Sequence, residues 1–147
     1  MIGIAVGAAS WPVGRPDLLH AFFSTISGCL EPDGWGSRFP ALLGELYQGR
    51  LTADRVDDAL AELLVARREL AALPPSAVVW DIDDLDVTPP WGSAIDSGVP
   101  DLARYFITSD GRDLVAVLAN GLSFLRELGV GDLQVVSVED ATVALVG

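Results

Sequence analysis

The stretch that decides the fold is Thr52–Ile82, which reads TADRVDDALAELLVARRELAALPPSAVVWDI. From Thr52 to Leu73 apolar residues recur at helical spacing, with acids in the first turns and arginines toward the end, which complements the helix dipole. Thr52 is suited to cap this helix, and two prolines end it. The apolar run Val78–Ile82 then predicts a buried strand. The helix stripe expected to face the core is Val56, Leu60, Leu63, Leu64 and Leu70.

Similar signals predict the elements on either side of this stretch. Strands are expected at Ile2–Val6, Ala103–Thr108, Leu133–Val138 and Thr142–Val146. Helices are expected at Pro16–Leu30, at about Phe39–Tyr47 behind a Ser37 cap, and from a cap at Ser109 or Asp110 to Leu128. This mixed order indicates an α/β or α+β fold, with a single sheet of about five strands packed by three to four helices. At 147 residues the chain is expected to form one domain, 1–147.

Composition narrows the classes of partner. The chain carries 21 acidic residues against nine arginines, no lysine, and a net charge of −12. Such acidity disfavours contact with nucleic acid or anionic membranes, and favours basic proteins, cations or simple solubility. Cys29 is the only cysteine, so no internal disulfide is expected. The N-terminus lacks a positive leader, and no run reaches the roughly 18 apolar residues of a membrane helix, so a cytoplasmic protein is expected.

The most informative motif is Ala77–Gly92, AVVWDIDDLDVTPPWG, which admits two interpretations. Asp84, Asp86 and Thr88 have the DxDxT spacing of haloacid-dehalogenase-like phosphatases, which use an aspartate nucleophile and Mg²⁺. Three features oppose this interpretation: little chain follows the motif, two prolines remove amides that a phosphate would need, and lysine is absent. A small phosphatase using the Asp84/Asp86 pair is therefore the alternative. The other interpretation is an acidic surface that meets a basic partner protein.

Other catalytic and metal sites find little support in the sequence. An EF-hand-like loop counted from Asp81 lacks both its glycine and its terminal glutamate. His20 is the only histidine and lies in the middle of a helix among apolar residues, which is typical of a structural histidine. The glycines near the N-terminus form no nucleotide-binding pattern. The sequence predicts no catalytic residue, no cofactor and no metal site, and hence no enzyme.

Three tryptophans lie beside turn residues, at positions 11, 35 and 91. Such a tryptophan either pins a loop onto the core or anchors an interface, where tryptophan is enriched. Trp91 closely follows the four aspartates Asp81, Asp83, Asp84 and Asp86, and we call the stretch that carries them the acidic motif. Their charge can steer a basic partner while the ring fills a pocket. The candidate partner-binding residues are therefore Asp81, Asp83, Asp84, Asp86 and Trp91.

Four phrases carry a resemblance to a known family. They are FFSTI at Phe22–Ile26, GWGSRFP at Gly34–Pro40 leading into ELYQG, VVWDIDDL at Val78–Leu85 followed by PPWG, and YFITSDGRDL at Tyr105–Leu114. In this order and spacing the chain resembles the immunity protein 70 family of bacterial polymorphic toxin systems. The resemblance covers roughly residues 1–128. No single phrase is a catalytic signature, and the match depends on all four together.

The resemblance implies a non-enzymatic protein that is encoded beside a toxin, binds it in the cytoplasm and protects the producing cell. The partner would be a cognate toxin domain, and the acidity of this chain favours a basic one such as a nuclease. The sequence leaves open whether the protein forms a homo-oligomer.

The binding surface has two candidate locations of equal standing. One is the acidic motif. The other is the Thr52–Leu73 helix, because pair specificity needs surfaces that differ between relatives. In that second case the shared phrases are structural: Arg38 and Arg112 would pair with aspartates inside the fold, and SDGRD would start a capped helix.

Overall fold

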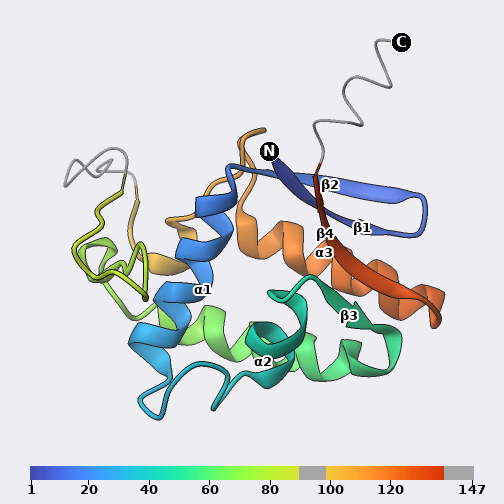
Figure 1. Ribbon diagram of the computed structural model, residues 1–147, viewed down its shortest axis with the longest axis horizontal. Helices are drawn as coiled ribbons and strands as arrows, with labels where there is room; N and C mark the ends of the chain where they lie inside the picture. The colour runs from blue at the N-terminus through green and yellow to red at the C-terminus, as the bar shows by residue number, and fades with distance from the viewer. Residues whose placement is uncertain (90–98, 138–147) are drawn as a thin grey trace.

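The computed structural model describes residues 1–89 and 99–137. Within them the chain has an α+β fold built on one antiparallel sheet in the order β2-β1-β4-β3, which confirms the predicted fold class (Figure 1). The strands are Ile2–Val6 (β1), Ala9–Gly14 (β2), Arg50–Thr52 (β3) and Asp132–Ser137 (β4).

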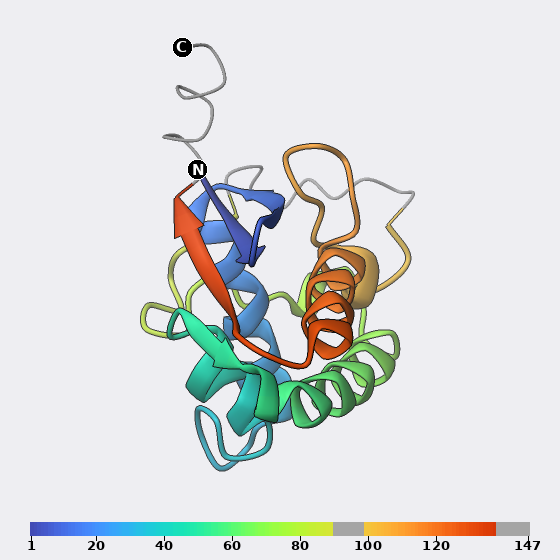
Figure 2. The ribbon, with the colours of Figure 1, turned by 90° about the vertical axis from the view of Figure 1, so that its right-hand side faces the viewer.

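Three α-helices cover the sheet and one another. They are Pro16–Leu30 (α1), Val56–Leu70 (α2) and Leu114–Leu128 (α3). Helix α3 packs on β1, β2 and β4, α2 packs against α3, and α1 packs against α2 and β2 (Figures 1 and 2). Shorter elements are a π-helix at Leu42–Leu46 (η1) and 3₁₀ turns at Ala53–Arg55 (η2), Pro75–Ala77 (η3) and Leu102–Arg104 (η4).

Helix α3 packs closely onto β1 at Gly121. Gly121 faces the buried side chains of Ile4 and Leu133, and a Cβ at this glycine would lie 2.5 Å from Ile4 Cδ1. The bare backbone of Gly121 therefore allows the helix to approach the sheet. Five large apolar residues of α3 are buried in the core: Leu114, Val117, Leu118, Leu122 and Leu125.

Two strands were not predicted from the sequence. Strand β2 follows β1 across a two-residue loop in which Gly7 has a φ of +58°, a conformation that glycine adopts at little cost. Pro12 is accommodated because β2 is an edge strand, where a missing N–H is tolerated. Strand β3 has only three residues, too few to show an alternating pattern.

The predicted helices exist, most of them with shifted ends, and the one predicted at about Phe39–Tyr47 is the π-helix η1. Helix Pro16–Leu30 was predicted with both ends correct. Helix Thr52–Leu73 is shorter than predicted: η2 precedes it and Thr52 makes no capping hydrogen bond. Its stripe was partly wrong, since Leu64 is 59% exposed, whereas Ala59 and Ala66 are buried.

Two predicted caps were also wrong. The amides of Ala41 and Leu42 bind the carboxylate of Glu62, while Ser37 donates to the carbonyl of Gly34. Asp113, and neither Ser109 nor Asp110, caps α3 by accepting from the amide of Val115.

Two predicted strands are absent from the sheet. Within the described residues Val78–Ile82 pairs with no strand and bends at Trp80, while Ala103–Thr108 holds the end of η4 and then only an isolated bridge between Ile107 and Asp113. The predicted strand Thr142–Val146 lies outside the described residues, as does the end of the one predicted at Leu133–Val138, which is otherwise confirmed as β4. No helix in the described part of the chain is long and apolar enough to cross a membrane.

Candidate functional site

The segment that leads into the acidic motif is bound to α1 by hydroxyl groups. Thr25 Oγ1 donates to the carbonyl oxygen of Val79 at 3.0 Å and accepts from its amide at 3.1 Å. Ser24 Oγ accepts from the amide of Ile82 at 3.1 Å. Two buried side chains thus replace a neighbouring strand as hydrogen-bond partners, which explains why the apolar run Val78–Ile82 is not part of the sheet.

A glycine on α1 brings this segment close. The Cβ of any larger residue at Gly28 would lie 3.0 Å from Val79 Cγ2 and 3.4 Å from Ile82 Cδ1. At the next residue, Cys29 Sγ donates to the carbonyl of Ala77, and burial raises the pKa of its thiol. The thiol is therefore protonated at neutral pH and is a poor nucleophile.

From Asp81 to Val87 the acidic motif folds as two consecutive turns that its own carboxylates hold together. Asp81 Oδ1 accepts from the amide of Asp83 at 2.9 Å, and Asp84 Oδ1 accepts from the amide of Asp86 at 3.2 Å. Two of the four acids therefore have a structural role, which aspartate commonly takes in turns. The carboxylates of Asp83 and Asp86 are exposed to solvent.

Apolar side chains stand among these acids on the outer face of the turns. Leu85 is 76% exposed and Val87 is 41% exposed. In the part of the chain that the structure describes, no arginine pairs with Asp83, Asp84 or Asp86. The motif thus presents exposed apolar groups surrounded by unneutralised carboxylates.

His20 lies behind this surface and was not expected there. Its Nε2 is 2.9 Å from Asp81 Oδ1, and its Nδ1 is 2.6 Å from the hydroxyl of Tyr47. The hydrogen bond with His20 is the main reason that the pKa of Asp81 lies below its usual value. The histidine joins α1, the end of η1 and the acidic motif, which is the structural role predicted for it.

Ligand atoms of His20, Asp81 and Asp83 lie within 4.8 Å of one another, close enough to contact a single cation. We propose no metal site here, because His20 and Asp81 already pair directly and Asp83 is exposed to solvent. We expect thermal melts in millimolar Ca²⁺ or Mg²⁺ to coincide with melts in chelator. A large rise in Tm with either cation would mean that the ion binds the folded state and that the prediction of no metal site is wrong.

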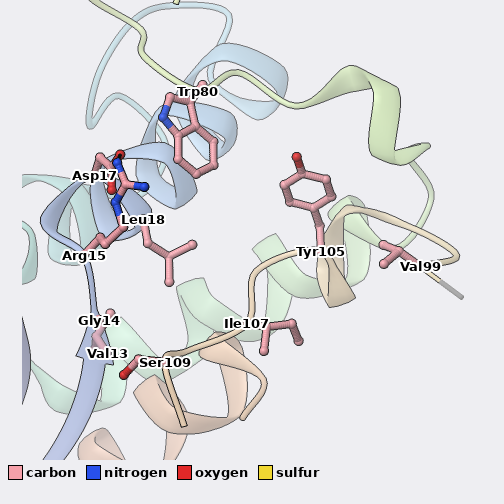
Figure 3. Close-up of a pocket in the computed structure, with 10 residues that line it drawn as sticks. All are labelled: Val13, Gly14, Arg15, Asp17, Leu18, Trp80, Val99, Tyr105, Ile107 and Ser109. Atoms are coloured by element: carbon pink, nitrogen blue, oxygen red, sulfur yellow. Dashed lines mark hydrogen bonds and ion pairs between the residues drawn. The ribbon is translucent and has the colours of Figure 1, made fainter. Parts of the chain in front are cut away.

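The segment from Trp80 to Asp83 lines two pockets among the described residues. The larger has a volume of about 410 Å³, and Trp80, Leu18, Tyr105 and Ile107 surround it (Figure 3). The ion pair between Arg15 and Asp17 borders it on one side. The smaller has a volume of about 280 Å³ and is lined by His20, Trp35, Tyr47, Gln48, Ile82 and Asp83.

The GWGSRFP phrase forms a loop that closes around one buried acid. The carboxylate of Glu31 accepts from the amides of Gly36, Arg38 and Phe39 at 2.9–3.0 Å. Trp35 is pinned to the core, since its Nε1 donates to the carbonyl of Leu43 at 3.1 Å and its ring packs edge-on to Tyr47. This loop forms one wall of the smaller pocket.

The two arginines of the shared phrases do not pair with the acidic motif. Arg38 is bound to Glu69, and Arg112 forms an ion pair with Asp110 at 3.2 Å. Thr108, the residue before SDGRD, accepts from the amide of Arg112 and closes a turn before α3. The expected pairing with aspartates inside the fold was therefore wrong for Arg38, whose partner is a glutamate, and Arg112 pairs with its aspartate at the surface. The expected capped helix start is present, because Asp113 of SDGRD caps α3.

The structure brings together most of the predicted site residues. Asp81, Asp83, Asp84 and Asp86 form one surface, whereas Trp91 lies outside the described residues. The strand predicted at Val78–Ile82, which would have led into the Asp84/Asp86 pair of the phosphatase alternative, is not found in the described part of the chain. Leu85 was missed, although a leucine between two aspartates in a turn was a usable signal.

Comparison with known proteins gives one match. No curated protein matches the chain, and no solved structure does. A sequence model described as Immunity protein 70 matches residues 4–135, which include all four phrases and every described strand except the ends of β1 and β4. The chain therefore belongs to the immunity protein 70 family.

Proposed function

We propose that this chain is a single-domain immunity protein that binds a cognate toxin domain of a bacterial polymorphic toxin system and neutralises it in the cytoplasm of the producing cell. Membership of the immunity protein 70 family suggests a role against a toxin. We propose that the protein acts by binding and not by catalysis. The fold supports this, because the carboxylates of the acidic motif are used to shape its turns or face solvent.

The observation that carries the proposal is the exposed Leu85 among Asp83, Asp84 and Asp86. Protein interfaces typically combine an apolar centre, which gives most of the binding energy, with a polar rim. The acidic turns have this arrangement on a small scale. We propose that Asp81 orients the turns, that the three other aspartates and Leu85 contact the toxin, and that Trp91 adds a second anchor.

The net charge of this chain indicates which charge the surface of the toxin should carry. At a net charge of −12 the chain attracts basic proteins and repels nucleic acid and anionic membranes. We propose a basic toxin domain, and a nuclease is one class that fits. The toxin would meet the acidic motif with arginine or lysine side chains around an apolar contact.

Helix α2 is the second candidate surface, and it offers a matched control. Leu64 on α2 is 59% exposed, comparable with Leu85 at 76%. The same substitution at both leucines places one positive charge on each surface. It should leave the fold intact, because both side chains lie largely in solvent.

We expect Leu85→Arg to weaken binding of the toxin domain encoded beside this gene by about 30-fold or more, the loss typical of a central interface residue. Leu64→Arg should bind like the parent. Titration calorimetry measures both affinities, and co-expression with the toxin measures protection of growth. If Leu64→Arg weakens binding and Leu85→Arg does not, the interface lies on α2. If the parent neither binds nor protects, the proposed function is wrong.

A further inference from the structure

We infer that the smaller pocket, lined by His20, Trp35, Tyr47, Gln48, Ile82 and Asp83, is the site that takes one arginine side chain of the toxin. This inference rests on the proposed function for the identity of the partner. The chemistry of the pocket can nevertheless be tested without any toxin.

The aromatic walls of the pocket are held in place before any partner arrives. Trp35 and Tyr47 pack with ring centroids 5.1 Å apart at an angle of 66°. The Trp35 indole donates to the carbonyl of Leu43, and the Tyr47 hydroxyl is hydrogen-bonded to His20. Gln48 is anchored to the same carbonyl at 3.3 Å. A pocket whose walls are already ordered binds a side chain at a lower entropic cost.

The charge at the pocket selects its occupant. Asp83 is exposed, and its carboxylate forms no ion pair with any of the described arginines. The negative charge extends into the pocket. Burial is the main reason that the pKa of the Tyr47 hydroxyl is raised, and the neighbouring carboxylates of Asp83 and Asp81 raise it further. Such a pocket favours a cation and disfavours an acidic side chain.

Arginine fits this combination of aromatic rings and a carboxylate better than lysine does. Its planar guanidinium stacks on an aromatic ring and donates two parallel hydrogen bonds to a carboxylate, whereas the lysine ammonium is a compact and strongly hydrated charge. The apolar contacts with Trp35 and Ile82 would cover the aliphatic stem. A volume of about 280 Å³ leaves room for one long side chain and water.

The smaller pocket also adjoins the surface of the proposed interface. Asp83 lines the pocket, and Leu85 lies two residues further along the same turns. A toxin that contacts Leu85 can therefore place a neighbouring arginine in the pocket. The larger pocket, which Trp80 lines, has a mainly apolar lining and already contains an arginine paired with an acid.

The test uses nuclear magnetic resonance of the ¹⁵N-labelled full chain. Each of the four tryptophans contributes one indole N–H signal, and Trp35→Phe identifies that of Trp35. The probes are N-acetyl-arginine methylamide and its neutral analogue, N-acetyl-citrulline methylamide. We expect the arginine probe to shift the Trp35 signal with saturation in the millimolar range, and the citrulline probe to leave it in place.

Variants make the test specific to the pocket. Asp83→Asn should weaken binding of the arginine probe by about fivefold or more, as expected for loss of a charged partner. Glu127→Gln on α3 removes the same charge elsewhere and should leave binding unchanged. The inference is overturned if the arginine probe gives no saturable shift, if both probes act alike, or if Asp83→Asn binds like the parent. None of these outcomes depends on the toxin, so they leave the proposed function standing.

Discussion

Replacing Phe106 by alanine is expected to lower the free energy of unfolding by about 3–5 kcal/mol, the range for a buried phenylalanine whose cavity cannot collapse. Phe106 is fully buried and packs edge-on against Phe22 at 5.3 Å between ring centroids. Its carbonyl also accepts from the amide of Leu114, at the start of α3. The ring therefore ties the irregular segment before α3 to the core.

Phe124→Ala is the matched control for this prediction. Phe124 is 36% exposed and contacts Trp11 at the edge of the fold, with 5.7 Å between centroids. Its loss should cost about 1 kcal/mol or less. Urea unfolding followed by circular dichroism measures both variants. Equal destabilisation by the two substitutions would show that the buried Phe106 contributes no more to stability than the partly exposed Phe124.

Replacing Glu31 by alanine should lower the free energy of unfolding by about 3 kcal/mol or more, because three backbone amides lose a charged acceptor. These amides belong to Gly36, Arg38 and Phe39, and Glu31 itself is only 4% exposed. Glu31→Gln should also be clearly destabilising, because its NH₂ group would face backbone donors. The loop that carries Trp35 should loosen, and tryptophan fluorescence should change before global unfolding.

Glu69→Ala provides the comparison for Glu31. It removes the ion pair with Arg38, but that carboxylate lies at the surface, where such pairs contribute about 0–1 kcal/mol. If Glu31→Ala is no more destabilising than Glu69→Ala in urea unfolding, the loop is not held by the buried acid. The family phrase GWGSRFP would then need another explanation.

Sequence alone was sufficient where structure is determined locally. Helix α1 begins at a proline and repeats apolar residues every three or four positions, and both of its ends were predicted correctly. The sequence alone was insufficient at Val78–Ile82. This segment has the apolar pattern of a buried strand, but its backbone forms hydrogen bonds with the hydroxyls of Ser24 and Thr25. Nothing within the segment shows that its hydrogen bonds go to a helix more than fifty residues earlier in the chain.

The same distinction applies to the site. The clustering of aspartates was visible in the sequence, and the structure keeps them on one surface. Their division into turn-forming and solvent-facing acids was not visible, since it depends on backbone hydrogen bonds at Asp83 and Asp86. His20 joined the site through folding alone, from a helix 61 residues away from Asp81.

The central claim is that the acidic turns meet a basic toxin. The most direct test is the association rate with the toxin domain encoded beside this gene, measured by surface-binding kinetics at low and high ionic strength. We predict fast association that slows as salt screens the charges. A variant with asparagine at Asp83, Asp84 and Asp86 should associate slowly at both salt concentrations. Tight binding whose rate depends on neither salt nor these three aspartates would contradict the account.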